Sequence, residues 1–408
     1  MSDYQTHVFT STYTADVSGV CSAMYELGGM TILHDPSGCN STYSTHDEPR
    51  WFDGKSLMFV SGLDEMTAVL GDDQVIIDDT AAAAGDLKPR FITLCGGSIP
   101  HIIAFDFKGT AHLIEKKTGI PVLPVATDGL KSYVSGVGMA LTEWIKRFAD
   151  PSESIWERMP AASGRGFSSA QWKKKGSSGL CVNLLGVTPL DFSINGNVQA
   201  MRAAFEDAGI PVNCCAAMGE TFDSLSHIYR GAVNVVVSSA GRRPARFMEK
   251  KAGIPRVEGL PAGPDEASAL MEAVRAAYED GKSRILWQEP AEHEHWTCPQ
   301  GQILVIGEEI CSCAIADAIN RLPAEKRGGR LAFPMWPDID EGLPEAELIA
   351  AMRSADTVIA DPLYRVVLGR AGKTRFIDFP HEAYSGRIYR KDMRLFAGTE
   401  FSAEDLLR

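Results

Sequence analysis

Two cysteines in the sequence stand beside glycine turns that follow apolar runs. Cys39 closes residues 32–39 (ILHDPSGC), and Cys95 ends residues 91–95 (FITLC) just before a Gly-Gly pair. A cysteine in such a turn lies at the loop edge of a sheet, where backbone N–H groups can stabilise the thiolate that binds metal. Open α/β sheets also bind ligands at the carboxyl ends of their strands. The pattern predicts a metal or ligand site at this edge, with a buried structural thiol as the alternative for Cys39.

The remaining cysteines give weaker signals. Cys21 lies in the apolar helical stretch 17–27, where it can face the same pocket or pack inward. A C-x-C pair on a helix and the cysteines of two strands are predicted to pack in the core, with cofactor contact as the alternative for the helical pair. A HEHWTC run has zinc-like spacing but no second ligand pair, so a polar loop between domains is predicted there. These residues are Cys311, Cys313, Cys181, Cys214, Cys215, His293, His295 and Cys298.

Short β-rich runs alternate with amphipathic helical stretches along almost the whole chain. This alternation builds parallel sheets that are covered by helices. A helix, then Gly-Ile-Pro, then a strand recurs at 117–125, 207–213 and 251–257. Glycine ends the helix in a left-handed turn and proline cannot continue it. The sequence therefore predicts the α/β class, with several doubly wound, Rossmann-like parallel sheets rather than one barrel.

Two breaks in the apolar pattern divide the chain. Between Asp150 and Gly179, a Ser/Gly-rich stretch and a basic run carry no sustained periodicity, which is typical of a linker. A second, softer break falls near residues 289–301. We therefore expect an N-terminal domain at 1–150, a linker at 151–179, a second α/β domain at 180–290 and a third at 291–408.

Composition and charge exclude several classes of protein. The 408 residues are 45% hydrophobic and 23% charged, which is typical of a globular protein with more than one packed unit. The net charge of −13 disfavours nucleic acid and membrane surfaces, because both are bound through clustered Lys and Arg. We find no apolar run of transmembrane length and no signal peptide, so we expect a cytoplasmic protein. The absence of a phosphate loop and of a dinucleotide fingerprint assigns any use of ATP or nicotinamide to another protein.

The turn HDPSGC at residues 34–39 resembles the H-G-P-x-G-C turn of the nitrogenase component 1 family. That family includes nitrogenase subunits, light-independent protochlorophyllide and chlorophyllide reductases, the nickel-tetrapyrrole reductase of methanogens and cofactor-assembly scaffolds. In the family, the turn cysteine and a later strand-end cysteine bind an iron–sulfur cluster at a subunit interface, and Cys39 and Cys95 match these two positions. Similar stretches follow at 105–109 (FDFKG), 117–122 (KTGIPV), 127–129 (TDG), 195–212 and 380–386 (PHEAYSG).

The resemblance implies three α/β domains of the family's fold and a cluster shared between subunits. The family's first cluster cysteine has no counterpart here, because its region holds residues 12–14 (TYT). A [4Fe–4S] cluster therefore fits better than the larger nitrogenase cluster, with Cys39 and Cys95 from each subunit and Cys21 as a further candidate ligand. Next to them, Gly38, Gly96 and Gly97 would let backbone N–H groups approach the cluster sulfides.

The resemblance also implies partners and a substrate site. Family members receive electrons from a separate ATP-hydrolysing iron protein, which agrees with the missing phosphate loop. The other implied partner is a second subunit, either a copy of this chain or a paralogue, in a dimer or heterotetramer. A small-molecule substrate would bind where the strand ends of the three units converge. The candidate proton donors are His34, His101 and His381.

Three functions stay open on this basis. The first is a nitrogenase-like reductase subunit, the second an assembly scaffold for a cluster or metallocofactor, and the third a metal-free α/β binding protein. The strand on which catalytic nitrogenase subunits carry a cofactor cysteine has Ser238 and Ser239 here, so a second metallocofactor is unassigned and dinitrogen reduction is not expected. Residues 46–51 (HDEPRW) are compatible with a substrate or partner contact and equally with a solvated loop.

Overall fold

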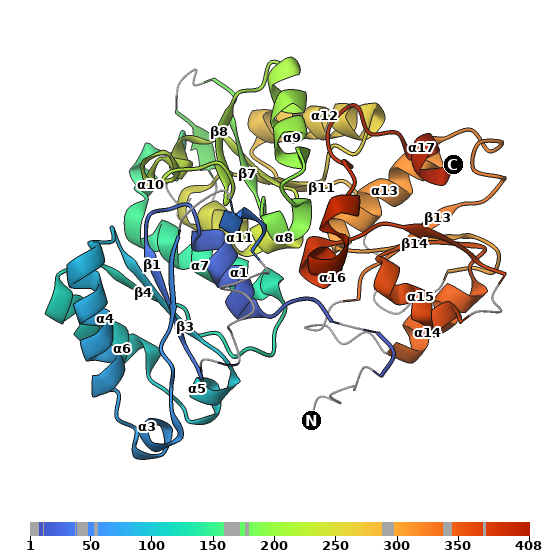
Figure 1. Ribbon diagram of the computed structural model, residues 1–408. Coiled ribbons are helices and arrows are strands. Elements are labelled where there is room, and N and C mark those ends of the chain that lie inside the picture. The colour runs from blue at the N-terminus through green and yellow to red at the C-terminus, as the bar shows by residue number, and fades with distance from the viewer. Residues whose placement is uncertain are drawn as a thin grey trace, which may run out of the picture.

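The structure is a computed structural model that describes most of the chain. The described residues are 8–10, 12–36, 38, 48–52, 56–158, 172–175, 179–287, 298–337, 345–369 and 373–408. Within them, three parallel sheets lie side by side, each with its own helices, and we name them the first unit (blue to cyan), the second unit (green to yellow) and the third unit (orange to red) (Figure 1). The predicted α/β class with several doubly wound parallel sheets is confirmed.

The first unit contains a sheet in the order β2-β1-β3-β4, in which every neighbouring pair is parallel. β1 and β3 are buried along their whole length, which explains why their sequences do not alternate between apolar and polar residues. The strands are β1 (Met30–His34), β2 (Leu57–Val60), β3 (Ile92–Gly96) and β4 (Val122–Pro124). The helices are α1 (Asp16–Met24), α3 (Glu65–Leu70), α4 (Gln74–Leu87), α5 (Ser98–Ile102), α6 (Phe107–Thr118) and α7 (Tyr133–Phe148).

The second unit contains a parallel sheet in the order β11-β10-β9-β7-β8. A separate antiparallel pair, β5 (Trp156–Arg158) and β6 (Trp172–Lys174), lies within the stretch 151–179 that the sequence suggested as a linker. The strands of the sheet are β7 (Val182–Leu185), β8 (Val212–Ala216), β9 (Val233–Val236), β10 (Arg256–Glu258) and β11 (Arg284–Ile285). The helices are α8 (Pro189–Phe192), α9 (Asn197–Asp207), α10 (Phe222–Ser226), α11 (Arg242–Ala252) and α12 (Pro264–Asp280).

The third unit repeats the same design with a parallel sheet in the order β13-β12-β14-β15. The strands are β12 (Ile303–Ile306), β13 (Ala332–Met335), β14 (Thr357–Ala360) and β15 (Arg375–Asp378). The helices are α13 (Glu309–Arg321), α14 (Glu345–Ser354), α15 (Arg365–Leu368), α16 (Glu382–Tyr389) and α17 (Ala403–Leu407). Short 3-10 helices, among them η2 (Pro49–Phe52) and η5 (Ser239–Gly241), complete the described chain.

Each sheet has a place where the direction of strand addition reverses, which lies between β1 and β3, between β7 and β9, and between β12 and β14. In open α/β sheets, ligands bind outside the carboxyl ends of the strands at such a place. The three reversals therefore mark where the chain positions residues for chemistry. The strand ends that flank them are His34 and Gly96, Leu185 and Val236, and Ile306 and Ala360.

Helices α1 and α7 touch backbone to backbone near the centre of the molecule. All nine residues of α1 are buried. A Cβ at Gly19 would stand 2.2 Å from the carbonyl oxygen of Tyr133, and a Cβ at Gly136 would stand 1.8 Å from the carbonyl oxygen of Asp16. Glycine is therefore required at both positions for this close approach. Because α7 also packs against α11, the helix pair joins the first unit to the second.

One hydrophobic core runs through the inner parts of all three units. Buried residues of α1, α7, the second sheet and α13 belong to this single cluster, together with one face of the first sheet and one face of the third. The opposite faces of these two sheets each have a smaller separate cluster. The units are therefore packed against one another rather than tethered. Among the described residues, no helix combines the length and the apolar composition needed to cross a membrane.

The helix contact gives a stability prediction. Gly136→Ala should lower the free energy of unfolding by about 1–3 kcal/mol, because the added methyl group must push α1 and α7 apart. The control is Gly85→Ala in α4, where a Cβ would meet nothing within 4 Å. That substitution should raise stability by about 0.5–1 kcal/mol. Urea unfolding of both variants measures the difference, and equal effects would show that α1 and α7 are not in close contact.

Candidate functional site

Two of the predicted cluster cysteines lie next to each other inside the first unit. Cys95, on β3, is paired across the sheet with Leu33, and its Sγ donates a hydrogen bond to the carbonyl oxygen of Ile32 at 3.7 Å. Cys21, on α1, is in hydrogen-bonding contact with the Cys95 thiol, and burial raises the pKa of Cys21 well above its ordinary value. Neither side chain has any exposed surface. In the chain by itself, the pair is a buried dithiol.

Two of the predicted glycines lie directly against the end of β1 and the turn that follows it. A Cβ at Gly96 would stand 2.8 Å from the carbonyl oxygen of His34, and a Cβ at Gly97 would stand 2.1 Å from Oδ2 of Asp35. The space that these glycines leave is therefore filled by the turn that follows β1. Gly38 is different, because a Cβ there would meet nothing within 4 Å.

The histidines of the first unit occupy contrasting environments. The side chain of His34 is 4% exposed, its Nδ1 lies 2.9 Å from Oγ of Ser61, and its ring packs on Phe105 with the ring centroids 4.2 Å apart. Burial lowers the pKa of His34 to about 4, so the ring is neutral at pH 7. His101 lies at the end of α5 and is exposed. The structure brings His34 to the edge that also carries Cys95, while His101 faces solvent.

Whether these residues fit an iron–sulfur cluster depends on donor type and donor number. Thiols are the donors that such clusters use. Cys21 and Cys95 supply two, while Cys39 lies outside the described residues. The described part of the chain contains no group of three His, Cys, Asp or Glu side chains placed to hold a metal ion. These residues therefore fit a cluster as part of a ligand set that other ligands must complete.

A second group of polar residues lies where the three units meet. Asp191, on α8, accepts a hydrogen bond from the hydroxyl of Tyr133 at 2.6 Å and another from Thr188 Oγ1 at 2.8 Å. His381 precedes α16, and its Nε2 lies 3.8 Å from Asp191 Oδ1. Neither ring nitrogen of His381 has a hydrogen-bond partner in the described part of the chain, although the side chain is buried.

Glu308, between β12 and α13, extends this group into the third unit. Its Oε1 accepts hydrogen bonds from the backbone N–H of Ser239 at 2.8 Å and from Ser239 Oγ at 2.5 Å, so the reversal points of the second and third sheets are joined directly. We name Tyr133, Thr188, Asp191, Ser239, Glu308 and His381 the interunit cluster. Beside it lies a cavity of about 20 Å³, lined by Tyr13, Tyr133, Glu308 and Trp336 among others. This space holds about one water molecule.

Burial decides which group of the interunit cluster carries a proton. Burial, reinforced by the negative charge of Glu308, raises the pKa of Asp191 to about 8. Burial also raises the pKa of Glu308 and lowers the pKa of His381 to about 4. At pH 7 the histidine is therefore neutral, and Asp191 holds a proton. A carboxylic acid with this pKa is suited to proton transfer.

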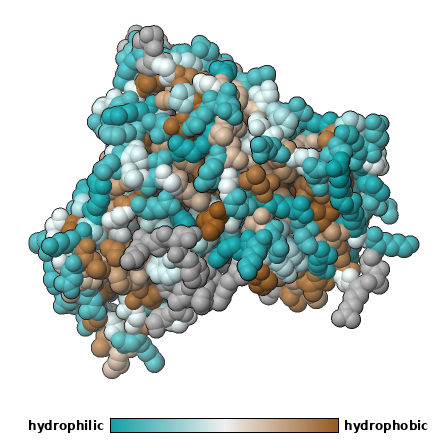
Figure 2. Space-filling model, turned by 45° about the horizontal axis from the view of Figure 1, so that its top comes forward, coloured by the Kyte–Doolittle hydropathy of each residue, from teal (hydrophilic) through white to brown (hydrophobic). Residues whose placement is uncertain are grey.

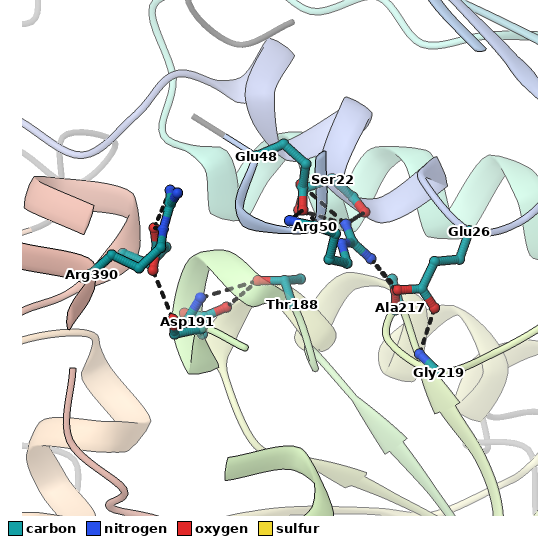
Figure 3. A network of polar contacts seen from close by, with 11 residues as sticks. Ser22, Glu26, Glu48, Arg50, Thr188, Asp191, Ala217, Gly219 and Arg390 are labelled. Carbon is teal, nitrogen blue, oxygen red and sulfur yellow. Dashed lines mark hydrogen bonds and ion pairs between the residues drawn. The ribbon is translucent and has the colours of Figure 1, made fainter. Parts of the chain in front are cut away.

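A buried arginine fixes the chain on the far side of the undescribed segment 39–47. Arg50 Nε donates to Glu48 Oε1 at 2.6 Å, and its Nη atoms reach Glu26, the carbonyl oxygen of Ser22 on α1 and the carbonyl oxygen of Ala217 in the second unit. Figure 3 shows Arg50 enclosed by these groups, with Asp191 on the neighbouring α8. Because Glu48 and Arg50 are buried, the hypothesis of a solvated loop is wrong for the described residues of the HDEPRW motif.

With this geometry established, comparison with known proteins places the chain in a family. The model of the family described as nitrogenase component 1 type oxidoreductase matches residues 19–296. The chain belongs to this family. A solved structure titled "Nitrogenase Cp1 at pH 5" shares the fold, with a TM-score of 0.61 and 15% identity, and the alignment covers 100% of this chain and 89% of that one. The resemblance suggested by the HDPSGC turn is confirmed at the level of family and fold.

Individual relatives are distant members of the nitrogenase component 1 family. One of them, a light-independent protochlorophyllide reductase subunit from Prosthecochloris aestuarii, is 24% identical over 279 residues, which is 67% of this chain and 47% of that protein. The iron-molybdenum cofactor biosynthesis protein NifE of Methanococcus maripaludis is 22% identical over 258 residues, 61% and 48% respectively. The nitrogenase molybdenum-iron protein alpha chain of Azospirillum brasilense is 23% identical over 268 residues, 61% and 50%. The chain thus spans about half the length of these curated relatives.

The other cysteines of this family member follow the sequence predictions with one exception. Four of the five that were predicted to lie in the core are buried, whereas Cys181 is only partly buried because it precedes β7 instead of lying within it. The HEHWTC run lies outside the described residues apart from Cys298, which is buried. The buried cysteines are Cys214, Cys215, Cys311 and Cys313.

Sequence reasoning missed the acidic members of the interunit cluster. Asp191 lies on α8, the short helix that follows β7, and Glu308 lies between β12 and α13, so both come after a strand of a parallel sheet. That position is the available signal, since such strand ends converge on ligands. Tyr133 carries no comparable signal, because its partner Asp191 belongs to a different unit.

Arg50→Met should destabilise the fold by about 3–5 kcal/mol, because it leaves the Glu48 carboxylate buried without its counter-ion. Arg147→Met is the matched control, since Arg147 pairs with Glu115 on the surface. The control should cost about 0–1 kcal/mol. Denaturant unfolding measures both. A double variant, Glu48→Gln with Arg50→Met, should recover part of the loss, and an additive loss would contradict a buried pair.

Asp191→Asn should change the pH dependence of stability. The folded state holds the Asp191 proton up to about pH 8, whereas an unfolded aspartate releases it near pH 3.9. The folded state therefore binds more protons across this window, and wild-type stability should fall as pH rises through it. The variant lacks this titration, so wild type should lose stability relative to Asp191→Asn as the pH rises from about 4 to about 8. A difference that stays constant across this pH range would show that Asp191 is ionised throughout.

Proposed function

We propose that this chain is a redox subunit of a nitrogenase-like oxidoreductase. In this proposal Cys39 and Cys95 hold a [4Fe–4S] cluster together with a second subunit, an ATP-hydrolysing iron protein supplies electrons, and a small molecule is reduced at the interunit cluster. The observation that carries the proposal is the edge of the first sheet, where the turn after β1 that leads to Cys39 packs against the end of β3 that carries Cys95.

The chain's own residues would serve electron transfer at the sheet edge that carries Cys95 and proton transfer at the interunit cluster. When bound, an iron–sulfur cluster supplies one-electron transfer at a potential set by its ligands, nearby hydrogen bonds and burial. Cys21 lies against Cys95 and is the nearest described thiol that can join or support the ligand set. At the interunit cluster, Asp191 holds a proton, and Tyr133 and Thr188 orient its carboxyl group. Neutral His381 offers a ligand two ring nitrogens that no described residue bonds.

Exposed apolar side chains around the same sheet edge support the proposal that a protein partner binds there. Met66, Val69 and Leu70 on α3 are 67%, 76% and 71% exposed, and Ile102 on α5 is 74% exposed. Large apolar side chains gathered on a surface mark interaction sites more often than they mark free surface. Both helices follow strands of the first sheet at the end where Cys95 lies. A subunit or electron donor that covers them would also bring ligands or electrons to that edge.

An assembly scaffold is the second candidate function. The similarity to the cofactor biosynthesis protein NifE favours it. NifE matches this chain about as well as the nitrogenase alpha chain does, with 22% and 23% identity, each over 61% of this chain. A scaffold would hold iron but would not turn over substrate. Substrate reduction by the chain together with an ATP-dependent iron protein therefore separates the two functions.

The cluster proposal predicts iron and acid-labile sulfide in anaerobically purified protein. Four irons shared by two subunits amount to about two iron and two sulfide per chain. Cys39→Ala should abolish the iron, and Cys95→Ala should lower or abolish it. Cys313→Ala is the control, because Cys313 is a buried thiol on α13 in the third unit, and its iron content should be that of wild type.

Each outcome of this measurement has a clear reading. Full iron in Cys39→Ala would make the cluster assignment wrong. Full iron in Cys95→Ala alone would show that the buried dithiol is structural and that the ligands lie elsewhere. No iron in wild type, even after reconstitution, would leave a metal-free binding protein that uses the inherited fold.

A further inference from the structure

A cavity of about 210 Å³ lies in the first unit, away from the interunit cluster. It opens at the carboxyl ends of β1 and β2 beneath α3 and α4, and it shares no lining residue with the small cavity between the units. Its apolar lining includes Ile32, Phe59, Ile76 and Ala83. Figure 2 shows hydrophobic residues on this lobe of the molecule, at the lower left. A cavity of about 150 Å³ is enough for benzene, so this one has room for an aromatic ring with a short chain.

The rim of the cavity is acidic. Asp64, Asp72, Asp73 and Asp79 line it, and the described lining residues include no Lys or Arg. Asp73 is half-buried at the start of α4, and its carboxylate makes no capping bond. Burial and repulsion from Asp106 and Asp72 raise its pKa, so the ionised carboxylate lacks a compensating positive charge within the described residues. A cation placed in the cavity would supply that charge.

His34 adds a polar group to the inner wall. Only 4% of the residue is exposed, and it lines the cavity. Ser61 binds its Nδ1, and no group in the described part of the chain bonds its Nε2. Because burial keeps the ring neutral at pH 7, His34 does not repel a cation. The cavity thus combines an apolar floor, a neutral hydrogen-bonding nitrogen and a negative rim.

We propose that this cavity binds a small organic amine that carries one aromatic ring or a branched aliphatic group. The ammonium group would pair with Asp73 at the rim, and the apolar body would rest on Ile32 and Ile76. Four carboxylates on the rim disfavour phosphates and carboxylic acids of the same size. This binding activity goes beyond the proposed redox function, because it needs none of Cys39, Cys95 and Asp191.

The test uses the full chain and three probes of one shape: 2-phenylethylamine, 2-phenylethanol and 3-phenylpropanoate. Isothermal titration at pH 7 should give saturable binding of the amine, about tenfold tighter than the alcohol and tighter still than the carboxylate. Asp73→Asn should remove the preference for the amine, since asparagine keeps the shape of the side chain without the charge. Asp86→Asn, on α4 but outside the cavity lining, should keep it.

A shape variant locates the binding site independently of charge. Ala83→Leu fills the cavity and should abolish binding of both the amine and the alcohol. Equal affinity for all three probes, no saturable binding of the amine, or amine binding that survives Ala83→Leu would each overturn the proposal. Should Asp73→Asn not fold, Asp79→Asn on the exposed face of α4 takes its place, and an unchanged amine preference would then count against the acidic rim.

Discussion

The structure depends on the contact between α1 and α7, which is possible only because two glycines remove the side chains in between. α1 is buried on every side, so its position is set by what packs around it and not by solvent. At its start, Asp16 accepts backbone N–H groups of Asp128 and Gly129 at 3.0 Å, which ties the helix to the turn after β4. The same helix carries Cys21 to Cys95, while α7 carries the Tyr133 hydroxyl to Asp191. The helix pair thus links the thiol edge and the interunit cluster within one close-packed body.

Burial determines which titratable side chains inside the molecule are charged. Removing a carboxyl from water disfavours its ionised form, and removing an imidazole from water disfavours its protonated form. Asp191 therefore keeps a proton that His381 gives up, although histidine is the residue type usually expected to carry a proton at pH 7. Arg50 shows the opposite solution, since its charge is buried but matched by Glu48 and Glu26. A buried charge therefore needs a partner, as Arg50 has, whereas Asp191 and His381 are buried in their neutral forms.

The sequence predicted those features that depend on local pattern. Alternating runs indicated the parallel sheets, and the apolar run before a Gly-Gly pair placed Cys95 near the carboxyl end of a parallel strand, where β3 has it. The contact of Cys21 with Cys95 was left open, because the direction of a helical side chain depends on how the helix packs. Asp191 and Tyr133 were missed for a similar reason, since they meet across two units and 58 positions of sequence. The motif around Arg50 was compatible with both a contact and a solvated loop, because only tertiary packing shows whether a polar motif is buried.

The shared core has a consequence for how the interunit cluster works. Inner residues of all three units belong to one hydrophobic cluster, so moving one unit relative to another exposes apolar surface at about 25 cal/mol for each Å². The positions of Asp191, Glu308 and His381 are therefore set when the chain folds and not when a ligand arrives. The imidazole of His381 is buried without a hydrogen-bond partner among the described residues, which costs stability. A rigid core that holds unfavourable groups in place is the kind of preorganisation that the proposed reduction at the interunit cluster would need.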